Sequence, residues 1–444
     1  MSGIDNHPTV QALRASPPSV PPTPLTVAEL RQLCIDCGAD DAGVVSIGRS
    51  ELDDQRDDIL GHVPWTRSLL TFVCRMNREP IRSTARSLAN LEFHHTGDHV
   101  NAVARKVVRE LESRGFRAVN PSMGFPMEMD QFPGKLWVVS HKPVAVAAGL
   151  GQMGIHRNVI HPRFGSFILL GTVLLEQDVV GTEPQQVDFN PCLECKLCVA
   201  ACPVGAISPN GDFDFTACYT HNYREFLGGF TDWTEQVADS RSRNDYRKRV
   251  SDSESASVWQ SLSFGANYKS AYCLSVCPAG EDVIAPWLED RSAFMKQTLK
   301  PLQQKEETVY VIPGSDAADH VAKRFPHKHV KHVRGSLHPK SIDRFLKYMP
   351  LQFQRGQAKG LNATYHFTFT GAEQRKATVR ITDQKLEIEE GHIGECNLRV
   401  TADSETWLGF LKREKNLAVA LLTLRIRLSG SPSWLVKFGK CFPS

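Results

Sequence analysis

The chain has 444 residues, 41% of them hydrophobic, and a formal net charge of +3 at pH 7. This length can bury more than one hydrophobic core, so we expect several domains. Because the net charge is close to zero, no overall field favours a nucleic acid or a membrane surface, and nucleic acid binding is not expected.

Secretion and membrane insertion are not expected either. The sequence contains no run of about 18 apolar residues that could span a bilayer, and it shows neither a secretory apolar segment nor a twin-arginine leader. Its 12 cysteines include tightly spaced pairs, which indicate metal ligation in a reducing compartment rather than disulfides. We therefore expect a cytoplasmic protein with no membrane span.

The N-terminal half is predicted to be a short tail followed by an α/β domain. Residues 1–25 are rich in proline and should form a disordered tail. In the domain that follows, over residues 26–185, Thr26 and Glu29 form the pattern of a capping box at the start of a helix. The predicted helices cover 27–37 and about 99–114, and the predicted strands cover 42–46, 68–74 and 167–175.

A glycine-rich loop lies before the last of these strands. Gly149, Gly151 and Gly154 fit the G-x-G-x-x-G pattern, and Glu176 follows about 20 residues later, as in a dinucleotide fingerprint. Pro162, however, would end any helix too early for a Rossmann crossover. We expect instead a loop that either a packed neighbour or a ligand approaches closely, and the three glycines are candidate cofactor-binding residues.

The most specific motif is the C-x2-C-x2-C-x3-C-P run at residues 192–203. In such runs three cysteines hold one [4Fe–4S] cluster, and the fourth, before the proline, reaches a second cluster. A second set of cysteines is therefore expected downstream. The candidate metal ligands of both sets are Cys192, Cys195, Cys198, Cys202, Cys218, Cys273 and Cys277.

The glycine loop and the cysteine run carry a family resemblance. Residues 147–154 and the segment Cys202-Pro-Val-Gly-Ala-Ile207 resemble epoxyqueuosine reductase, a family related to reductive dehalogenases. The resemblance covers about residues 26–285 and implies a cobalamin-dependent reductase. Its nitroreductase-like α/β domain would bind base-off cobalamin, and a ferredoxin-like domain, here residues 186–290, would hold two [4Fe–4S] clusters that supply electrons.

Carried over by position, the resemblance assigns each cysteine to a cluster. Cys192, Cys195, Cys198 and Cys277 would hold the first cluster, and Cys202, Cys218 and Cys273 the second. Where the family has an eighth cysteine, this chain has Ser270. The second cluster would thus be either a [3Fe–4S] centre or a [4Fe–4S] centre with a serine, histidine or water ligand.

The family's catalytic positions differ in this chain. The aspartate proton donor of the family falls on Lys135, its glutamate falls on His141, and its Lys-Asn pair falls on Ile155 and His156. A changed acid implies a changed substrate or proton route, so tRNA modification is not predicted.

A reductase still needs a proton donor beside its reduced centre. Asp130, His141 and His156 flank the predicted pocket and are the candidate catalytic residues. The alternative for each histidine is a hydrogen-bonded surface or core residue. Lys135 and Lys142 are either solvated or hold a carboxylate or phosphate of a ligand.

Two charged segments follow. Residues 239–253, between Cys218 and Cys273, carry five Lys and Arg side chains. This insert is either a solvated helix face or a dock for an acidic electron donor such as flavodoxin or ferredoxin. Residues 291–345 are predicted to be a polar linker between domains.

The C-terminal segment, residues 346–444, has the pattern of a separate α/β domain. His366-Phe-Thr-Phe-Thr-Gly371, Ala402-Asp403, Trp407 and 426–430 resemble the sterol carrier protein fold. The resemblance implies an apolar tunnel for a lipid-like molecule; the alternative is a packed core or a docking face. Strands are predicted over 365–371, 377–381, 386–389 and 425–428, and helices over 405–413, with Ser404 as the cap, 417–422 and 432–438.

The sequence thus predicts a multidomain α/β (α+β) protein that functions as an iron–sulfur oxidoreductase. The favoured activity is that of a cobalamin-dependent reductase, with electrons from flavodoxin, ferredoxin or a reductase and a hydrophobic small molecule or lipid as the candidate substrate. Two alternatives stay open: a non-catalytic electron carrier for a partner enzyme, and a hydrophobic-ligand binder with a redox-sensing cluster.

Overall fold

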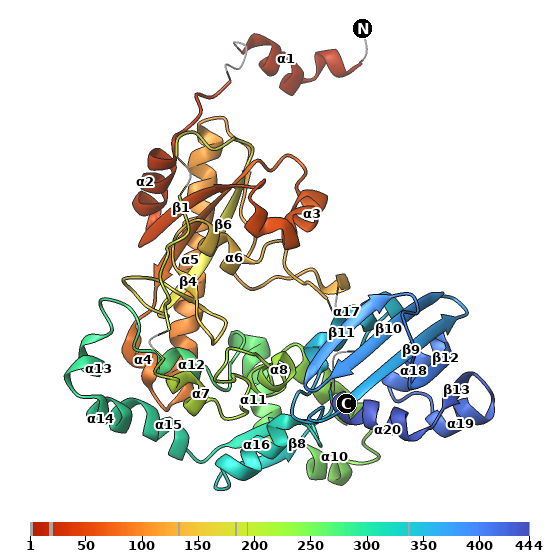
Figure 1. The fold of residues 1–444 in the computed structure, drawn as a ribbon. Coiled ribbons are helices and arrows are strands. Elements are labelled where there is room, and N and C mark those ends of the chain that lie inside the picture. Colours follow the sequence, from red (N-terminus) through yellow and green to blue (C-terminus); the bar gives the residue numbers. More distant parts are fainter. Residues whose placement is uncertain are drawn as a thin grey trace.

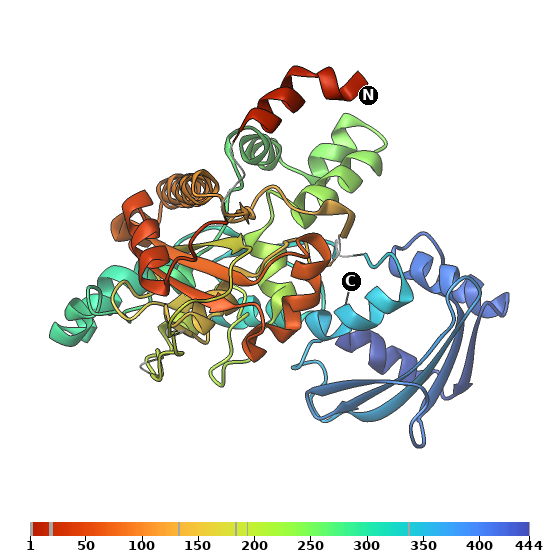
Figure 2. The same ribbon diagram turned by 90° about the horizontal axis from the view of Figure 1, so that it is seen from above.

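The computed structural model describes residues 3–16, 21–131, 134–182, 184–192, 194–335 and 338–443. Figure 1 shows an N-terminal domain in red to yellow, a helical middle region in green, and a C-terminal sheet domain in blue. In the view from above, the C-terminal domain stands beside the other two rather than on top of them (Figure 2). The mixed helix and strand content confirms the predicted multidomain α/β class.

The N-terminal tail contains a helix that was not predicted. α1 (Pro8–Ala15) begins at His7, whose Nδ1 accepts a hydrogen bond from the Thr9 backbone N–H over 3.2 Å. Pro8 is compatible with this helix because the first helical position needs no N–H donor. None of residues 8–15 is buried, and residues 1–2 and 17–20 of the predicted tail lie outside the described residues.

The N-terminal domain is built on a four-stranded antiparallel sheet with the order β1-β2-β6-β3. Its strands are β1 (Asp41–Ser46), β2 (Ser68–Arg75), β6 (Ile168–Leu175) and the short β3 (Ala118–Val119). The three longer strands confirm the prediction. One face packs on α2 (Val27–Cys37) and α5 (Arg86–Ser113), and the other packs on α3 (Asp53–His62) and α6 (His141–Ala147).

Helix α5 begins 13 residues earlier than the predicted start at residue 99. Its first half contacts the middle region instead of the sheet. The Asn90 side chain exchanges hydrogen bonds with the backbone of Tyr268, donating over 3.1 Å and accepting over 2.9 Å. Because these partners are remote in sequence, the apolar pattern of α5 alone did not reveal them.

The middle region holds the cysteines on short helices around one core. α7 (Leu197–Ala201), α8 (Phe215–Asn222) and α12 (Tyr272–Ser275) carry or flank them. The insert between Cys218 and Cys273 forms three further helices, α9 (Gly228–Ala238), α10 (Arg243–Arg249) and α11 (Asp252–Phe264).

Much of the segment predicted as a linker is folded. It contains α14 (Arg291–Phe294), α15 (Lys300–Gln304), β7 (Thr308–Val311), α16 (Asp316–Arg324) and β8 (His329–His332), and β7 pairs with β8 in parallel. Val309, Val321 and Phe325 are buried in the same core as the cysteine helices. Their short apolar runs lie between charged residues, so the segment looked polar overall.

The C-terminal domain is a five-stranded sheet with the order β11-β10-β9-β12-β13, in which only the β12–β9 pair is parallel. The strands are β9 (Asn362–Thr370), β10 (Arg375–Thr382), β11 (Lys385–Glu390), β12 (Leu398–Asp403) and β13 (Ile426–Gly430). The helices are α17 (Ile342–Gln352), α18 (Ser404–Leu411), α19 (Leu417–Leu422) and α20 (Ser433–Cys441). All predicted elements are confirmed, and α17 and β12 are additional.

Aromatic rings fill the space between this sheet and its helices. Trp407 lies within 5.9 Å, centroid to centroid, of Phe345, Phe367 and Phe369, and all four are buried. The cap of α18 is Asp403 rather than the predicted Ser404, since Asp403 Oδ2 accepts from the Thr406 backbone N–H over 3.0 Å. In the part of the chain that the structure describes, no helix is long and apolar enough to cross a bilayer.

Candidate functional site

Four cysteines from two distant segments line one small pocket. Cys192, Cys195 and Cys198 come from the run that ends in α7, and Cys277 follows α12. Two non-glycine residues of the run, Glu194 and Lys196, adopt left-handed backbone with φ of 52° each. Such conformations are uncommon outside glycine and often mark functional loops, and here they accompany a loop that presents successive thiols to one space.

Three further cysteines form a second group beside the first. Burial and the neighbouring Cys202 thiolate raise the pKa of Cys218 to about 12. Burial, followed by the thiolates of Cys218 and Cys202, raises the pKa of Cys273. Cys198 joins the two groups, because burial and the thiolates of Cys273 and Cys277 raise its pKa.

This chemistry fits iron–sulfur ligation. Buried thiols that resist ionisation when no cation is present become thiolates when a metal replaces their protons. Backbone N–H groups already point at two of the sulfurs: Ile155 N lies 3.4 Å from Cys192 Sγ, and Ala206 N lies 3.3 Å from Cys202 Sγ. Such N–H···S bonds are among the interactions that set cluster potentials. The ligand role of each cysteine stays a prediction.

Hydrogen bonds fix two further residues that the sequence analysis singled out, Ser270 and Lys142. The Ser270 backbone N–H donates to Asn222 Oδ1 over 2.8 Å at the end of α8. Lys142 is exposed as a residue, yet its Nζ donates to Arg157 O over 2.7 Å and to Asn158 Oδ1 over 2.8 Å. Burial lowers the pKa of this ammonium, and the thiolates of Cys273 and Cys218 oppose that effect. Lys142 is thus a cation close to the second group.

The three predicted catalytic residues lie in different places. His156 is 4% exposed and lines the pocket of the four cysteines; burial and the nearby Lys142 lower its pKa to about 4. Both ring nitrogens of His141 contact the chain, Nδ1 at 2.9 Å from Thr172 Oγ1 and Nε2 at 3.0 Å from Ser122 O. Asp130 is exposed in the short helix at 129–131. Their catalytic roles stay predictions.

The glycine loop is closely packed by its own chain. A Cβ atom at Gly149, where φ is 74°, would lie 2.5 Å from Gln185 O, and one at Gly151 would lie 2.3 Å from Ile160 O. At Gly154 a Cβ atom would lie 2.8 Å from the His156 ring. These contacts correspond to the packed-neighbour alternative, and the cofactor-binding role of the three glycines stays a prediction.

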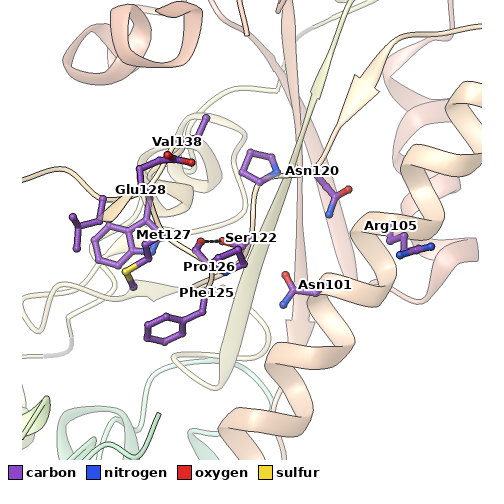
Figure 3. A pocket seen from close by; sticks show the side chains of 12 residues that line it. Asn101, Arg105, Asn120, Ser122, Phe125, Pro126, Met127, Glu128 and Val138 are labelled. Carbon is purple, nitrogen blue, oxygen red and sulfur yellow. Dashed lines mark hydrogen bonds between the residues drawn. The ribbon is translucent and has the colours of Figure 1, made fainter. Parts of the chain in front are cut away.

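A larger cavity of about 530 Å³ lies between α5 and the loop at 120–138 (Figure 3). Its lining residues are Asn101, Arg105, Asn120, Pro121, Ser122, Phe125, Pro126, Met127, Glu128, Leu136, Trp137 and Val138. Hydrogen bonds hold the loop in shape: Ser122 Oγ donates to Pro126 O over 2.7 Å, and Trp137 Nε1 donates to Gly124 O over 2.9 Å. Lys135 does not line the cavity but pairs with Asp58 over 2.7 Å.

Aromatic side chains extend from this cavity to the end of α8. Phe125 on the cavity wall lies 6.0 Å, centroid to centroid, from Phe226, which stacks on Tyr223 at 4.7 Å. Tyr223 caps the C-terminal end of α8, the helix that carries Cys218. The sequence analysis missed Tyr223 and Phe226. Their signal was the cluster of aromatic residues directly after Cys218.

Helix α17 of the C-terminal domain contacts both sites. Arg344 donates to the backbone O and to Oε1 of Gln131, over 2.5 and 3.0 Å, at the end of the cavity loop. Leu351 O accepts from Thr216 Oγ1 over 2.7 Å in α8, the helix that carries Cys218. The C-terminal domain is therefore attached to the cavity loop and to a cysteine helix.

Two families match parts of the chain. The 4Fe-4S binding domain family matches residues 186–208, and the SCP-2 sterol transfer family matches residues 346–443. The chain therefore contains a 4Fe-4S binding domain, which confirms an iron–sulfur cofactor, and a sterol-carrier-like domain.

Individual proteins extend these matches. The epoxyqueuosine reductase of Gloeobacter violaceus is 28% identical over 173 residues, which are 38% of this chain and 50% of that protein. The chain thus spans about half the length of this curated relative. The solved epoxyqueuosine reductase of Streptococcus thermophilus is 15% identical with a TM-score of 0.34, over 62% of this chain and 75% of that one. The predicted resemblance to epoxyqueuosine reductase is confirmed by the sequence match to the Gloeobacter violaceus protein.

Proposed function

We propose that the chain is an iron–sulfur reductase that delivers single electrons to an acceptor in the cavity between α5 and the loop at 120–138. One observation carries the proposal: the rings of Tyr223, Phe226 and Phe125 contact one another in turn, from the end of α8, the helix that carries Cys218, to the cavity wall. The sequence similarity to epoxyqueuosine reductase supports the same reaction class.

The chain's own residues prepare both ends of this path. Cysteine-held clusters, when bound, supply electrons one at a time. In the four-cysteine pocket Cys198 and Cys277 are buried, while Cys192 and Cys195 are half-buried. At the other end, Trp137 and Phe125 give the cavity apolar walls, while Asn101 and Asn120 contribute amides.

The acceptor that we propose is cobalamin, with a hydrophobic molecule as the final substrate. The fit rests on the chemistry of the cavity, because apolar walls suit a flat macrocycle and side-chain amides can pair with the amide groups around a corrin. The volume of about 530 Å³ is within the usual range for drug-sized ligands, so the larger cobalamin would lie only partly inside the cavity.

The test is an anaerobic reconstitution of the full chain with iron and sulfide, followed by titration with cobalamin under electron paramagnetic resonance. A base-off Co(II) signal that grows with protein is the expected result. Reduced clusters together with cobalamin that keeps the spectrum of the free compound would refute the cobalamin-dependent reductase.

A second candidate function is an electron carrier for a partner enzyme. It is favoured by the positions of the predicted proton donors, since His141 is bonded through both ring nitrogens and Asp130 lies exposed outside the cavity lining. A carrier reduces its partner at the same rate with an empty or a filled cavity. Stopped-flow reduction of a general acceptor dye, with and without cobalamin, separates the two functions.

We propose that the electron donor docks on α10 (Arg243–Arg249). None of residues 243–249 is buried, and Arg243, Arg247 and Lys248 are exposed. Acidic donors such as flavodoxin or ferredoxin associate faster with a basic surface, and salt weakens that effect. A rate of cluster reduction that does not change with ionic strength, or with Arg243→Glu and Lys248→Glu, would exclude this dock.

The C-terminal domain is proposed to take a hydrophobic small molecule or lipid, as the SCP-2 family match suggests. Because Trp407 and its aromatic neighbours fill the space under the sheet, a ligand must displace these rings. Quenching of tryptophan fluorescence by a fatty acid tests this, and unchanged fluorescence at saturating ligand would argue for a packed core. We place the protein in the cytoplasm, where a reducing environment preserves free thiols.

A further inference from the structure

A buried histidine that lines the pocket of the four cysteines has a ring nitrogen without a partner among the described residues. His156 is 4% exposed and lines this pocket together with Cys192, Cys195, Cys198 and Cys277. Its Nε2 is buried and has no hydrogen-bond partner among the described residues. Buried polar atoms in folded proteins are nearly always satisfied, so this nitrogen calls for an acceptor that is not part of the chain.

The hydrogen bonds of the other nitrogen fix where the proton lies. Nδ1 of His156 accepts from the Asn158 backbone N–H over 3.2 Å, so it carries no proton. In a neutral imidazole the proton is then on Nε2, which makes this atom a donor. The backbone of this loop is also held in place, because Asn158 Nδ2 donates to the His156 backbone O over 3.3 Å and Asn158 Oδ1 accepts from Lys142 Nζ over 2.8 Å.

The neighbouring residue shows which acceptors this loop meets. Ile155, directly before His156, points its backbone N–H at Cys192 Sγ over 3.4 Å. The loop therefore already directs one donor at a sulfur of the four-cysteine pocket. A cluster bound there adds sulfide and thiolate sulfurs, which are the acceptors that an N–H group facing the pocket would find.

We propose that His156 Nε2–H donates a hydrogen bond to a sulfur of the cluster held by Cys192, Cys195, Cys198 and Cys277, and that this bond raises the reduction potential of the cluster. Reduction adds negative charge to the sulfurs, so a donor stabilises the reduced state more than the oxidised one. The proposal needs the cluster but does not depend on the reductase activity.

The first test compares cluster potentials in the reconstituted full chain. His156→Phe keeps a ring but removes the donor. We expect the equilibrium constant for reduction of the first cluster to fall about tenfold, which lowers its reduction potential by about 59 mV for one electron. His156→Gln restores an N–H donor and should recover part of the change. The matched control is His366→Phe, because His366 also has a buried ring nitrogen, Nδ1, without a partner in the described ranges but lies on β9 of the C-terminal domain.

Equal potentials in the wild type and His156→Phe would overturn the proposal, as would an identical shift in His366→Phe. Because His156→Phe could fail to assemble the cluster, the second test uses the unaltered chain. Pulsed electron paramagnetic resonance of protein labelled with ¹⁵N-histidine should show a weak ¹⁵N coupling to the reduced first cluster. A spectrum without that coupling would refute the hydrogen bond without any variant.

Discussion

The aromatic contact between the cysteines and the cavity makes Phe226→Leu the most informative substitution. Phe226 is 7% exposed, and its ring lies 6.0 Å from Phe125, 4.7 Å from Tyr223 and 5.2 Å from Tyr268, centroid to centroid. Leucine fills most of the space but makes none of these ring contacts. Each aromatic pair contributes about 0.5–1.5 kcal/mol beyond burial, so the loss of three pairs should lower the free energy of unfolding by about 1.5–4.5 kcal/mol.

The assay has two readouts on the reconstituted protein. Urea unfolding followed by far-ultraviolet circular dichroism measures the stability change. Stopped-flow absorbance measures reduction of the clusters and reduction of the cavity acceptor separately. Phe226→Leu should slow only reduction of the cavity acceptor, because the substitution interrupts the ring contacts between the clusters and the cavity.

The matched control is Phe230→Leu in α9, which loses a single stacked ring, that of Trp233 at 5.7 Å. It should cost about 0.5–1.5 kcal/mol and leave both reduction steps unchanged. If Phe226→Leu and Phe230→Leu have the same effect on acceptor reduction, the aromatic path from the cysteines to the cavity is not used.

Three further predictions concern the middle region. Ser270→Cys should increase the iron bound per chain or convert a [3Fe–4S] signal to a [4Fe–4S] signal; unchanged iron and spectra would show that position 270 does not face a cluster. Burial lowers the pKa of His221 from 6.5 to about 4, so between these pH values the unfolded chain binds a proton that the folded chain does not. The free energy of unfolding should therefore fall by about 3 kcal/mol as the pH falls from about 6.5 to 4. Calorimetry should find a smaller dependence of stability on pH in His221→Phe. Asp232→Ala removes the carboxylate that lies 2.5 Å from the buried Arg224 guanidinium. The free energy of unfolding in urea should fall by about 3–5 kcal/mol. A loss below about 1 kcal/mol would mean that Glu254, 3.9 Å from Arg224, compensates.

Local signals predicted much of the fold. Capping and periodicity placed α2 at the observed residues, where Thr26 and Glu29 form both bonds of the capping box. The strands of the C-terminal sheet followed from their alternating apolar residues, because one face is buried and the other is not. The cysteine spacing was sufficient to predict an iron–sulfur site, since the ligands of one cluster lie mostly within a single loop.

Contacts between remote segments could not be predicted. Phe125 and Phe226 meet across 101 residues of sequence, and nothing in either segment indicates the other. His141 was a reasonable acid by position, but Thr172 and Ser122 bind both its nitrogens only in the folded chain. The orphan Nε2 of His156 likewise depends on where the Cys277 segment packs.

The position of the segment at 305–335 limits where the chain can be truncated for expression. A truncation at residue 290, where composition changes, would remove Val309, Val321 and Phe325 from the core that they share with the cysteine helices. Such a fragment would expose that core and should aggregate on expression. A chimaera that replaces the sterol-carrier-like module should therefore keep residues 305–335, and the new module must restore the bonds that α17 makes to Gln131 and Thr216.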